Sequence, residues 1–145
     1  MNFENQTPHK HDHLLDNSIR IIKAQNRREY NTFIRVPWSL YRDDPMWVPP
    51  LVLERRMHLS PKNPYFEHAT CCFWIAYRDE KPVGRISAQI DRLHLERYQD
   101  DTGFWGMLEA EDNIETFQTL LNTAENWLRS HGMVRARGPF SLSIN

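Results

Sequence analysis

The most regular pattern of apolar and polar positions lies near the C-terminal end of the chain, after residue 111. Apolar residues recur there at the spacing of a helix with one buried face. These positions are Ile114, Phe117, Leu120, Leu121, Ala124, Trp127 and Leu128. Asp112 is expected to cap the first turn, with Glu115 as its capping-box partner, and Gly132 to end the helix in a left-handed conformation. The pattern predicts an amphipathic helix from about residue 113 to 131 that packs on a sheet.

Two runs of strand-forming residues, 70–78 and 83–92, are separated by a short turn and predict an antiparallel hairpin. The second run alternates between two faces, which indicates one packed face and one polar face. Small and aliphatic side chains form the first face, namely Gly84, Ile86, Ala88 and Ile90. Polar side chains form the second, namely Arg85, Ser87, Gln89 and Asp91. The polar face either contacts a bound substrate or lies in solvent, and the pattern leaves both possibilities open.

The N-terminal part of the chain carries shorter signals. Residues 1–17 are polar, rich in histidine and aperiodic, which favours a flexible tail, and residues 18–24 predict a first strand. Asn26 followed by Glu29 resembles a capping box at the start of a helix. Pro37 lies inside that helical pattern, so we expect a kink or an end just before it, because proline lacks the backbone N–H.

The remaining segments connect these elements. Residues 41–50 contain three prolines and predict an irregular loop, whose Tyr41 and Trp47 either line a pocket or pack over the core. A short helix is expected over residues 51–59 and a polar connection over 94–102. Further strands are expected over 103–108 and 133–136, with a turn at 109–113 between the first of these and the long helix.

Composition narrows the class of protein. A chain of 145 residues with 40% hydrophobic and 26% charged residues fits one soluble globular domain, and a formal net charge of −1 predicts no binding to nucleic acid. No apolar run is long enough to span a membrane, and the N-terminus lacks a secretory signal. The two cysteines, Cys71 and Cys72, are adjacent and point to opposite faces of a strand, so they are expected to be reduced thiols. A cytoplasmic protein without membrane contact is the prediction.

The order of strand, two helices, hairpin, strand, helix and strand resembles the first two-thirds of the GNAT acyl-CoA N-acyltransferase fold. Several phrases resemble a little-characterised bacterial GNAT-like family: FIRVPWSLYRDDPMWVPPL, KNPYFEHA, PVGRISAQIDR, GFWGMLEAED, AENWLRSHGM and GPFSLSIN. The resemblance covers residues 18–145 and implies an α+β domain, with a mixed, mostly antiparallel sheet flanked by helices. It also implies that the fold is incomplete at the C-terminus, because the superfamily continues beyond this point.

The resemblance implies a site for acetyl-CoA or another acyl-CoA at the strand-to-helix turn. In the superfamily, glycine-rich backbone at this turn wraps the pyrophosphate. The corresponding cofactor-binding residues here are Met107, Leu108, Glu111, Asp112 and Asn113. No glycine is present among them, and an acid about 5 Å from a phosphate charge costs roughly 3 kcal/mol at an effective dielectric of 20. The turn therefore has the architecture of a phosphate site without its usual chemistry.

Two residues are candidate catalytic groups. Glu109 lies at the end of the strand, where several superfamily members place a carboxylate that deprotonates the acceptor amine. His94 is an alternative base. For Glu109, the competing interpretation is a solvated acidic turn.

The sequence supports two hypotheses from different classes, and a third option is an active acetyltransferase that uses a nonstandard cofactor turn. The first is the N-terminal part of a GNAT-like N-acyltransferase that acts on a small-molecule amine and supports a second, C-terminal module. The second is a non-catalytic binding or scaffold domain, or a truncated gene product. A chain that ends on a sheet strand is also expected to self-associate, because an unpaired strand edge can pair with another chain.

Overall fold

The computed structural model describes residues 18–140 and 142, and the tail predicted for residues 1–17 lies outside this part of the chain. The strands are β1 (Ile19–Lys23), β2 (Ala69–Arg78), β3 (Lys81–Asp91), β4 (Thr102–Ala110) and β5 (Arg135–Arg137). The helices are α1 (Arg27–Leu40), α2 (Val52–His58), α3 (Arg92–Tyr98) and α4 (Ile114–Ser130), with the 3-10 turn η1 (Pro64–Glu67) after α2.

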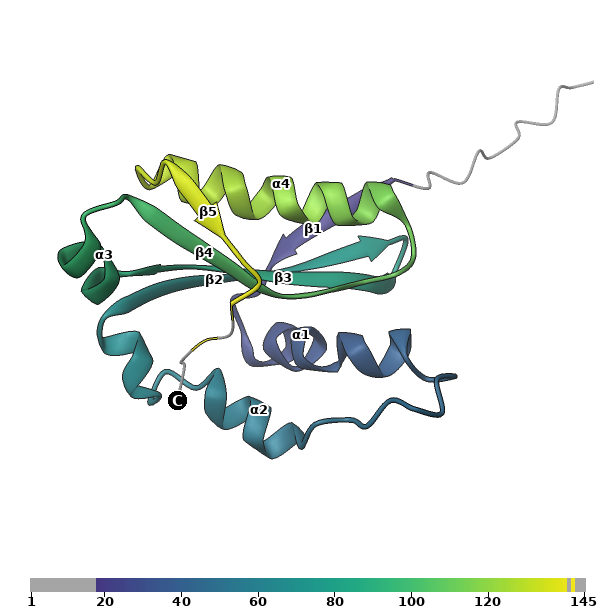
Figure 1. Cartoon of the computed structure of the whole chain (residues 1–145). Coiled ribbons are helices and arrows are strands. Elements are labelled where there is room, and N and C mark those ends of the chain that lie inside the picture. The colour runs from purple at the N-terminus through teal and green to yellow at the C-terminus, as the bar shows by residue number, and fades with distance from the viewer. Residues whose placement is uncertain (1–17, 141, 143–145) are drawn as a thin grey trace, which may run out of the picture.

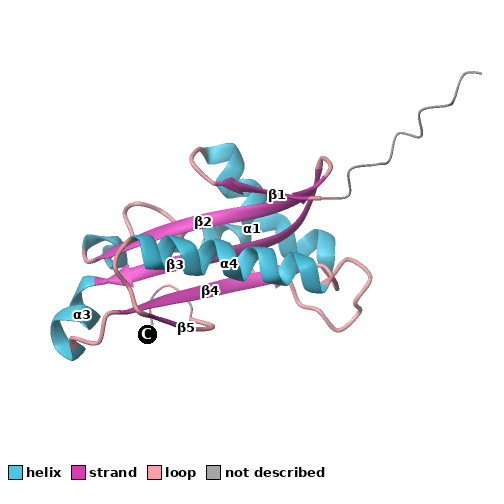
Figure 2. Cartoon of the chain, turned by 90° about the horizontal axis from the view of Figure 1, so that it is seen from above, coloured by secondary structure: helices cyan, strands magenta, loops and turns pink. Residues whose placement is uncertain are grey.

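The five strands form one sheet in the order β1-β2-β3-β4-β5. The pairs from β1 to β4 are antiparallel and only β5 is parallel to its neighbour, so the predicted α+β class with a mostly antiparallel sheet is confirmed. Helices α1 and α2 lie on one face of the sheet and α4 on the other (Figure 1). Seen from above, α4 runs along the strands (Figure 2). Each face carries its own buried apolar cluster.

Helix α1 begins as the sequence predicts and ends later than predicted. The Asn26 side chain accepts a hydrogen bond from the Glu29 amide, and the Glu29 carboxylate accepts one from the Asn26 amide. Of the two outcomes expected at Pro37, an end of the helix is wrong, because α1 continues to Leu40. A proline at this position frees the carbonyl of Phe33. Arg85 Nη1 donates to that carbonyl at 3.1 Å, so the freed acceptor is satisfied from the sheet.

The connection predicted for residues 94–102 is partly helical, which corrects the sequence-based expectation. Helix α3 begins directly after β3, where the Asp91 carboxylate caps it by accepting from the Leu93 amide. It ends at Gln99, which takes a left-handed conformation with φ of 47°. Seven residues are too few to show a helical apolar period, and the capping Asp91 was the signal available in the sequence.

Helix α4 is confirmed in type and extent, but its cap was assigned to the wrong residue. Asn113, and not Asp112, is the N-cap, because Glu109 and Ala110 belong to β4 and the turn is shorter than predicted. The C-terminal end is as expected. Gly132 has φ of +84°, and the amide of Met133 donates to the Leu128 carbonyl at 3.1 Å, which satisfies a carbonyl of the last turn.

The buried face of α4 is rotated relative to the predicted stripe. The fully buried residues follow a spacing of four positions and are Thr116, Leu120, Ala124 and Leu128. Ile114 is 77% exposed, so its assignment to the packed stripe is wrong. Trp127 is half-buried and packs edge-on against Trp74 of β2, with ring centroids 5.9 Å apart. Leu120 lies so close to Gly84 that a Cβ there would be 2.8 Å from the Leu120 Cδ1 atom.

The polar face of β3 is mostly buried. The possibility that this face lies in solvent is therefore wrong for most of its residues. Arg85, Ser87 and Gln89 are at most 8% exposed and lie on the face that α1 covers. The Ser87 hydroxyl and both polar atoms of the Gln89 side chain have no hydrogen-bond partner among the described residues. Cys71 and Cys72 are both free thiols, as predicted.

We expect Leu120→Ala to lower the free energy of unfolding by about 2–5 kcal/mol, because it removes a fully buried side chain and leaves a cavity against β3. The matched control is Ile114→Ala on the same helix, where the side chain is exposed and the change should stay within about 0.5 kcal/mol. Chemical denaturation of both variants measures the difference. Equal losses would contradict the observed orientation of α4.

Candidate active site

A tyrosine and a glutamate meet where the C-terminal end of α1 approaches the end of β4. Tyr41 follows the last residue of α1, and its hydroxyl donates a hydrogen bond to Glu109 Oε2. This hydrogen bond, with burial and the negative charge of Glu109, raises the pKa of Tyr41 to about 12, while Arg85 acts in the opposite direction. Tyr41 therefore stays protonated and continues to donate to the carboxylate through the physiological pH range.

Arg85 is a buried side chain that connects α1 to β4 next to the Tyr41–Glu109 pair. It is 8% exposed, and its Nε donates to the Met107 carbonyl at 3.1 Å while Nη1 reaches the Phe33 carbonyl. Its guanidinium carbon also lies 5.0 Å from the centre of the Phe33 ring, in cation–π geometry. Burial lowers the pKa of Arg85 to about 10, and the nearby Glu109 carboxylate opposes that shift. Arg85 remains a cation that connects α1 to β4.

Strand β4 is bulged at the site. Arg85 pairs with Glu109 but Ser87 pairs with Gly106, so β4 contains one residue more than β3 between these two pairs. Met107 lies in this bulge with φ of +51°, which is rare for a residue with a side chain. Met107 and Leu108, which the resemblance implies to be cofactor-binding, therefore lie at the bulge. The bulge also sets the position from which Glu109 extends.

On its other edge, β4 pairs with β5 and then with the backbone of Phe140, just before the bulge. Strand β5 pairs with Thr102–Phe104, and the Phe140 amide then donates to the Trp105 carbonyl at 2.9 Å. The backbone of Phe140 crosses so close to Gly106 that a Cβ there would be 1.8 Å from the Phe140 carbonyl oxygen. From Met107 onward, β4 has no ladder partner on its β5 side within the described part of the chain. The bulge thus coincides with an unpaired stretch of strand edge.

The N-terminus of α4 is occupied by side chains of the protein itself. The Asn113 side-chain oxygen Oδ1 accepts from the amides of Glu115 at 2.9 Å and Thr116 at 3.3 Å. Glu111 Oε1 accepts from the Thr116 hydroxyl at 2.9 Å and from Arg78 at 2.8 Å. A helix N-terminus attracts anions, and here a carboxylate already stands beside it.

This arrangement does not fit a pyrophosphate in the position that the resemblance implies. A phosphate would have to displace Glu111 from Thr116 and Arg78, and Asn113 from two amides. Asp112 is exposed and makes no hydrogen bond among the described residues, so it adds only negative charge at the turn. The geometry therefore gives a physical reason for the missing glycines: the turn is used for capping.

His94 lies apart from Glu109. Its Nε2–H donates a hydrogen bond to the Asp100 carboxylate at 3.1 Å, and its ring packs edge-on against Phe104, with ring centroids 4.9 Å apart. Asp100 precedes the first residue of β4, whereas Glu109 is near the last, so the two predicted catalytic residues lie toward opposite ends of that strand. The structure does not bring them together.

Two residues of this cluster had no functional assignment from the sequence alone. Tyr41 was expected either to line a pocket or to pack over the core with Trp47, and its ring does pack against Trp47, with centroids 5.6 Å apart. Its contact with Glu109 spans 68 positions, and no local pattern signals a pair so distant in the sequence. Arg85 was recognised only as part of the polar face of the hairpin.

Comparisons with known proteins place the fold. No family model matches the chain. It is 50% identical over 120 residues to Protein YghO of Escherichia coli (strain K12), covering 83% of this chain and 31% of that protein. It is 43% identical over 129 residues to a bacterial ceramide synthase of Caulobacter vibrioides (strain NA1000 / CB15N), covering 88% and 34%. The chain thus spans about a third of the length of these curated relatives.

Solved structures are similar at low sequence identity. An aminoglycoside acetyltransferase from an uncultured soil metagenomic sample, in complex with trehalose, aligns with a TM-score of 0.55 and 14% identity over 88% of this chain and 80% of that chain. A GNAT-family acetyltransferase from Staphylococcus aureus Mu50 gives 0.54 and 15% over 80% and 69%. The chain has the GNAT fold. At these identities the likeness establishes the fold alone, and the expected GNAT architecture is confirmed.

We expect the Glu109→Gln substitution to lower the pKa of Tyr41 from about 12 toward its usual value of 10, because the charged acceptor is lost. The raised pKa also makes the stability contributed by Tyr41 depend on pH. The pKa is raised by folding, so the stabilisation is complete below about pH 10 and is lost as the pH rises to about 12. Carbon NMR titration of the Tyr41 ring measures the pKa, and Glu115→Gln, an acid on α4, is the control. An unchanged pKa in Glu109→Gln would refute the pair.

We also expect millimolar acetyl-CoA to leave the melting temperature of this chain unchanged, because Glu111 and Asn113 occupy the α4 N-terminus. A ligand at 100 times its dissociation constant would add about 2.7 kcal/mol, or several degrees for a domain of this size. Glu111→Gln removes one repulsive charge and should permit at most a small shift, with Glu125→Gln as the control. A clear upward shift with the unsubstituted chain would mean that the backbone alone can bind the cofactor.

Proposed function

We propose that this chain is the N-terminal module of a GNAT-type N-acyltransferase, in which Glu109 acts as the base for an acceptor amine. The observation that carries the proposal is the Tyr41–Glu109 pair beside a bulge in β4, beyond the stretch that pairs with β5 in the described part of the chain. The fold is shared with acetyltransferases. The likeness to a protein named bacterial ceramide synthase supports acyl transfer to nitrogen, because a ceramide is an amide of a long-chain amino alcohol.

The proposed chemistry uses the carboxylate and its two neighbours. Glu109 accepts a proton from the acceptor nitrogen as that nitrogen forms its bond to the acyl carbon. The thioester C–S bond then breaks, and the coenzyme A thiolate leaves and takes up a proton from solvent, so that the products are an amide and a free thiol. The Tyr41 hydroxyl orients the carboxylate through its hydrogen bond, and Arg85 fixes the bulge from which Glu109 projects. An acyl-CoA would supply the acyl group. Because the α4 N-terminus does not fit its pyrophosphate, we assign that contact to a part of the protein outside this turn.

The domain assignment is part of the same proposal. Residues 18–145 would form the N-terminal, acid–base side of the protein, and a C-terminal module would hold the donor, since the relatives are about three times as long as the matched region. The isolated chain is then expected to self-associate or to dock with that module. We place the reaction in the cytoplasm, where acyl-CoA is available and where the free thiols Cys71 and Cys72 would remain reduced.

One observation favours a second candidate function. Glu111 and Asn113 occupy the helix terminus that acyltransferases of this fold are expected to use for the cofactor. This occupation would also suit a non-catalytic scaffold domain that retained the fold and lost the cofactor. The two candidates differ in what they require of Glu109, because a scaffold needs no base.

The test is an acyl-transfer assay on the complete gene product that contains this chain, with palmitoyl-CoA as donor and sphinganine as acceptor. We expect Glu109→Gln to lower kcat/KM by about 10²–10⁴-fold, and Tyr41→Phe by a smaller factor. The acid-matched control Glu125→Gln on α4 should stay within about twofold. Full activity in Glu109→Gln would exclude it as the base, and inactivity of the unsubstituted protein with every amine tried would favour the scaffold.

A further inference from the structure

A cavity with a volume of about 630 Å³ opens between α1, α2 and β2, at the N-terminal end of α1. Tyr41 is at the other end of this 14-residue helix, about 21 Å away along its axis. The cavity shares no lining residue with the Tyr41–Glu109 pair. Any binding here is therefore separate from the proposed acyl-transfer site.

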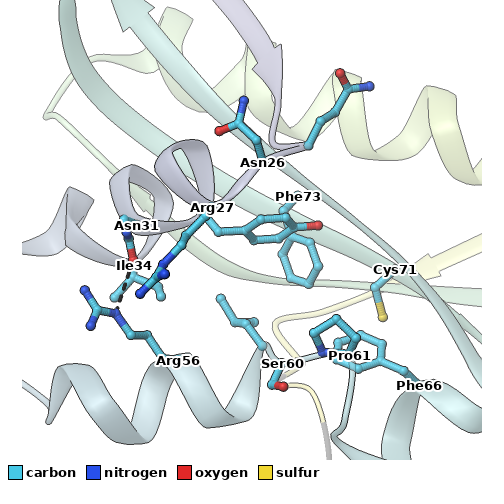
Figure 3. A pocket seen from close by; sticks show the side chains of 13 residues that line it. Asn26, Arg27, Asn31, Ile34, Arg56, Ser60, Pro61, Phe66, Cys71 and Phe73 are labelled. Carbon is cyan, nitrogen blue, oxygen red and sulfur yellow. Dashed lines mark hydrogen bonds between the residues drawn. The ribbon is translucent and has the colours of Figure 1, made fainter.

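The lining of the cavity is divided into a cationic part and an apolar part. Figure 3 shows Arg27 and Arg56 on one side and Phe73, Phe66 and Cys71 on the other. The apolar part is completed by Tyr30, Ile34, Leu59 and Pro61. Cys71 is partly buried, and this burial raises the pKa of its thiol to about 12. The volume lies within the range of small-molecule sites, which is about 300–1,000 Å³.

The two arginines carry the formal charges of the lining. The lining contains no aspartate or glutamate. Neither Arg27 nor Arg56 forms an ion pair with a carboxylate among the described residues. Glu29 lies two residues after Arg27, and its carboxylate accepts from the Gln25 amide at 2.6 Å as part of the helix cap. Two guanidinium groups without an ion-pair partner among the described residues therefore lie at a cavity whose lining combines apolar side chains with the polar residues Gln25, Asn26, Asn31 and Ser60.

One guanidinium is already oriented. Arg56 Nε donates to the Asn31 side-chain oxygen at 3.2 Å, which connects α2 to α1 and leaves its two terminal nitrogens available. A planar guanidinium with free N–H groups matches the geometry of a carboxylate. The apolar floor behind it would accommodate a hydrocarbon chain.

We infer that this cavity binds a single-chain amphiphile with a carboxylate head, such as a free fatty acid. The carboxylate lies between Arg27 and Arg56, and the chain extends over the rings of Phe66 and Phe73. A soluble ligand with a single chain fits this site, because the apolar residues line one space and the cations lie on one side of it. It does not depend on Glu109 acting as a base.

The experiment is calorimetric titration of this chain with sodium dodecanoate below its micellar concentration, with dodecyltrimethylammonium as the cationic counterpart. We expect saturable binding of dodecanoate and at least about tenfold weaker binding of the cation. The double variant Arg27→Gln/Arg56→Gln should weaken dodecanoate binding about tenfold, as expected for two partly exposed charge contacts. The matched control Arg28→Gln/Arg35→Gln removes the same charge from α1 at positions outside the cavity, and should change affinity by less than about twofold.

Amide NMR shifts locate the site, and we expect them to concentrate at Tyr30, Ile34 and Cys71. The inference is overturned if dodecanoate does not bind, if both double variants lose affinity equally, or if the shifts lie elsewhere. Co-sedimentation with phosphatidylglycerol vesicles separates the two sources of a fatty chain. Binding to vesicles without binding to dodecanoate would mean a membrane-surface contact and would also overturn the inference.

Discussion

The geometry of the candidate site depends on how one buried arginine satisfies carbonyl groups from two different elements. Arg85 donates to the Phe33 carbonyl of α1 and to the Met107 carbonyl in the bulge of β4. Pro37 cannot supply the first of these hydrogen bonds, and an unpaired buried carbonyl costs about 1–3 kcal/mol. A cation at this place is itself costly to bury, as its lowered pKa shows. The hydrogen bonds between the arginine and the two carbonyls offset both costs, and they form only when helix, bulge and arginine are present together.

The position of Tyr41 follows from that arrangement. Because α1 continues through Pro37 to Leu40, the next residue lies over the end of β4, where it reaches Glu109. A helix that ended before Pro37 would leave Tyr41 in the proline-rich loop, without a fixed partner. The hydrogen-bonded pair is thus built by a long-range compensation, and Tyr41 reaches Glu109 only because the helix does not break.

The sequence predicts those elements whose signals are local. The hairpin, the Asn26 capping box and the Gly132 helix end depend on neighbouring residues, and the structure contains all three. The errors lie where distant residues decide the outcome. Pro37 is tolerated because Arg85, 48 positions later, supplies a donor, and the polar face of β3 is buried because α1 covers it. The choice of Asn113 over Asp112 as the cap depends on where β4 ends, and neighbouring capping residues cannot distinguish the two.

The end of β4 and the helix terminus that follows it are built by separate sets of contacts. Glu109 accepts a hydrogen bond from Tyr41 next to the bulge, whereas the helix terminus one short turn later is occupied by Glu111, which contacts Arg78 and Thr116. A phosphate at this helix terminus would need more than glycines in the turn. It would have to displace Glu111, and Arg78 would then lose the carboxylate that it contacts at 2.8 Å. An ion pair of this kind resists single substitutions, since removing one partner leaves the other partly buried and uncompensated. The contacts of the capping turn therefore support one another, and they do not involve Glu109.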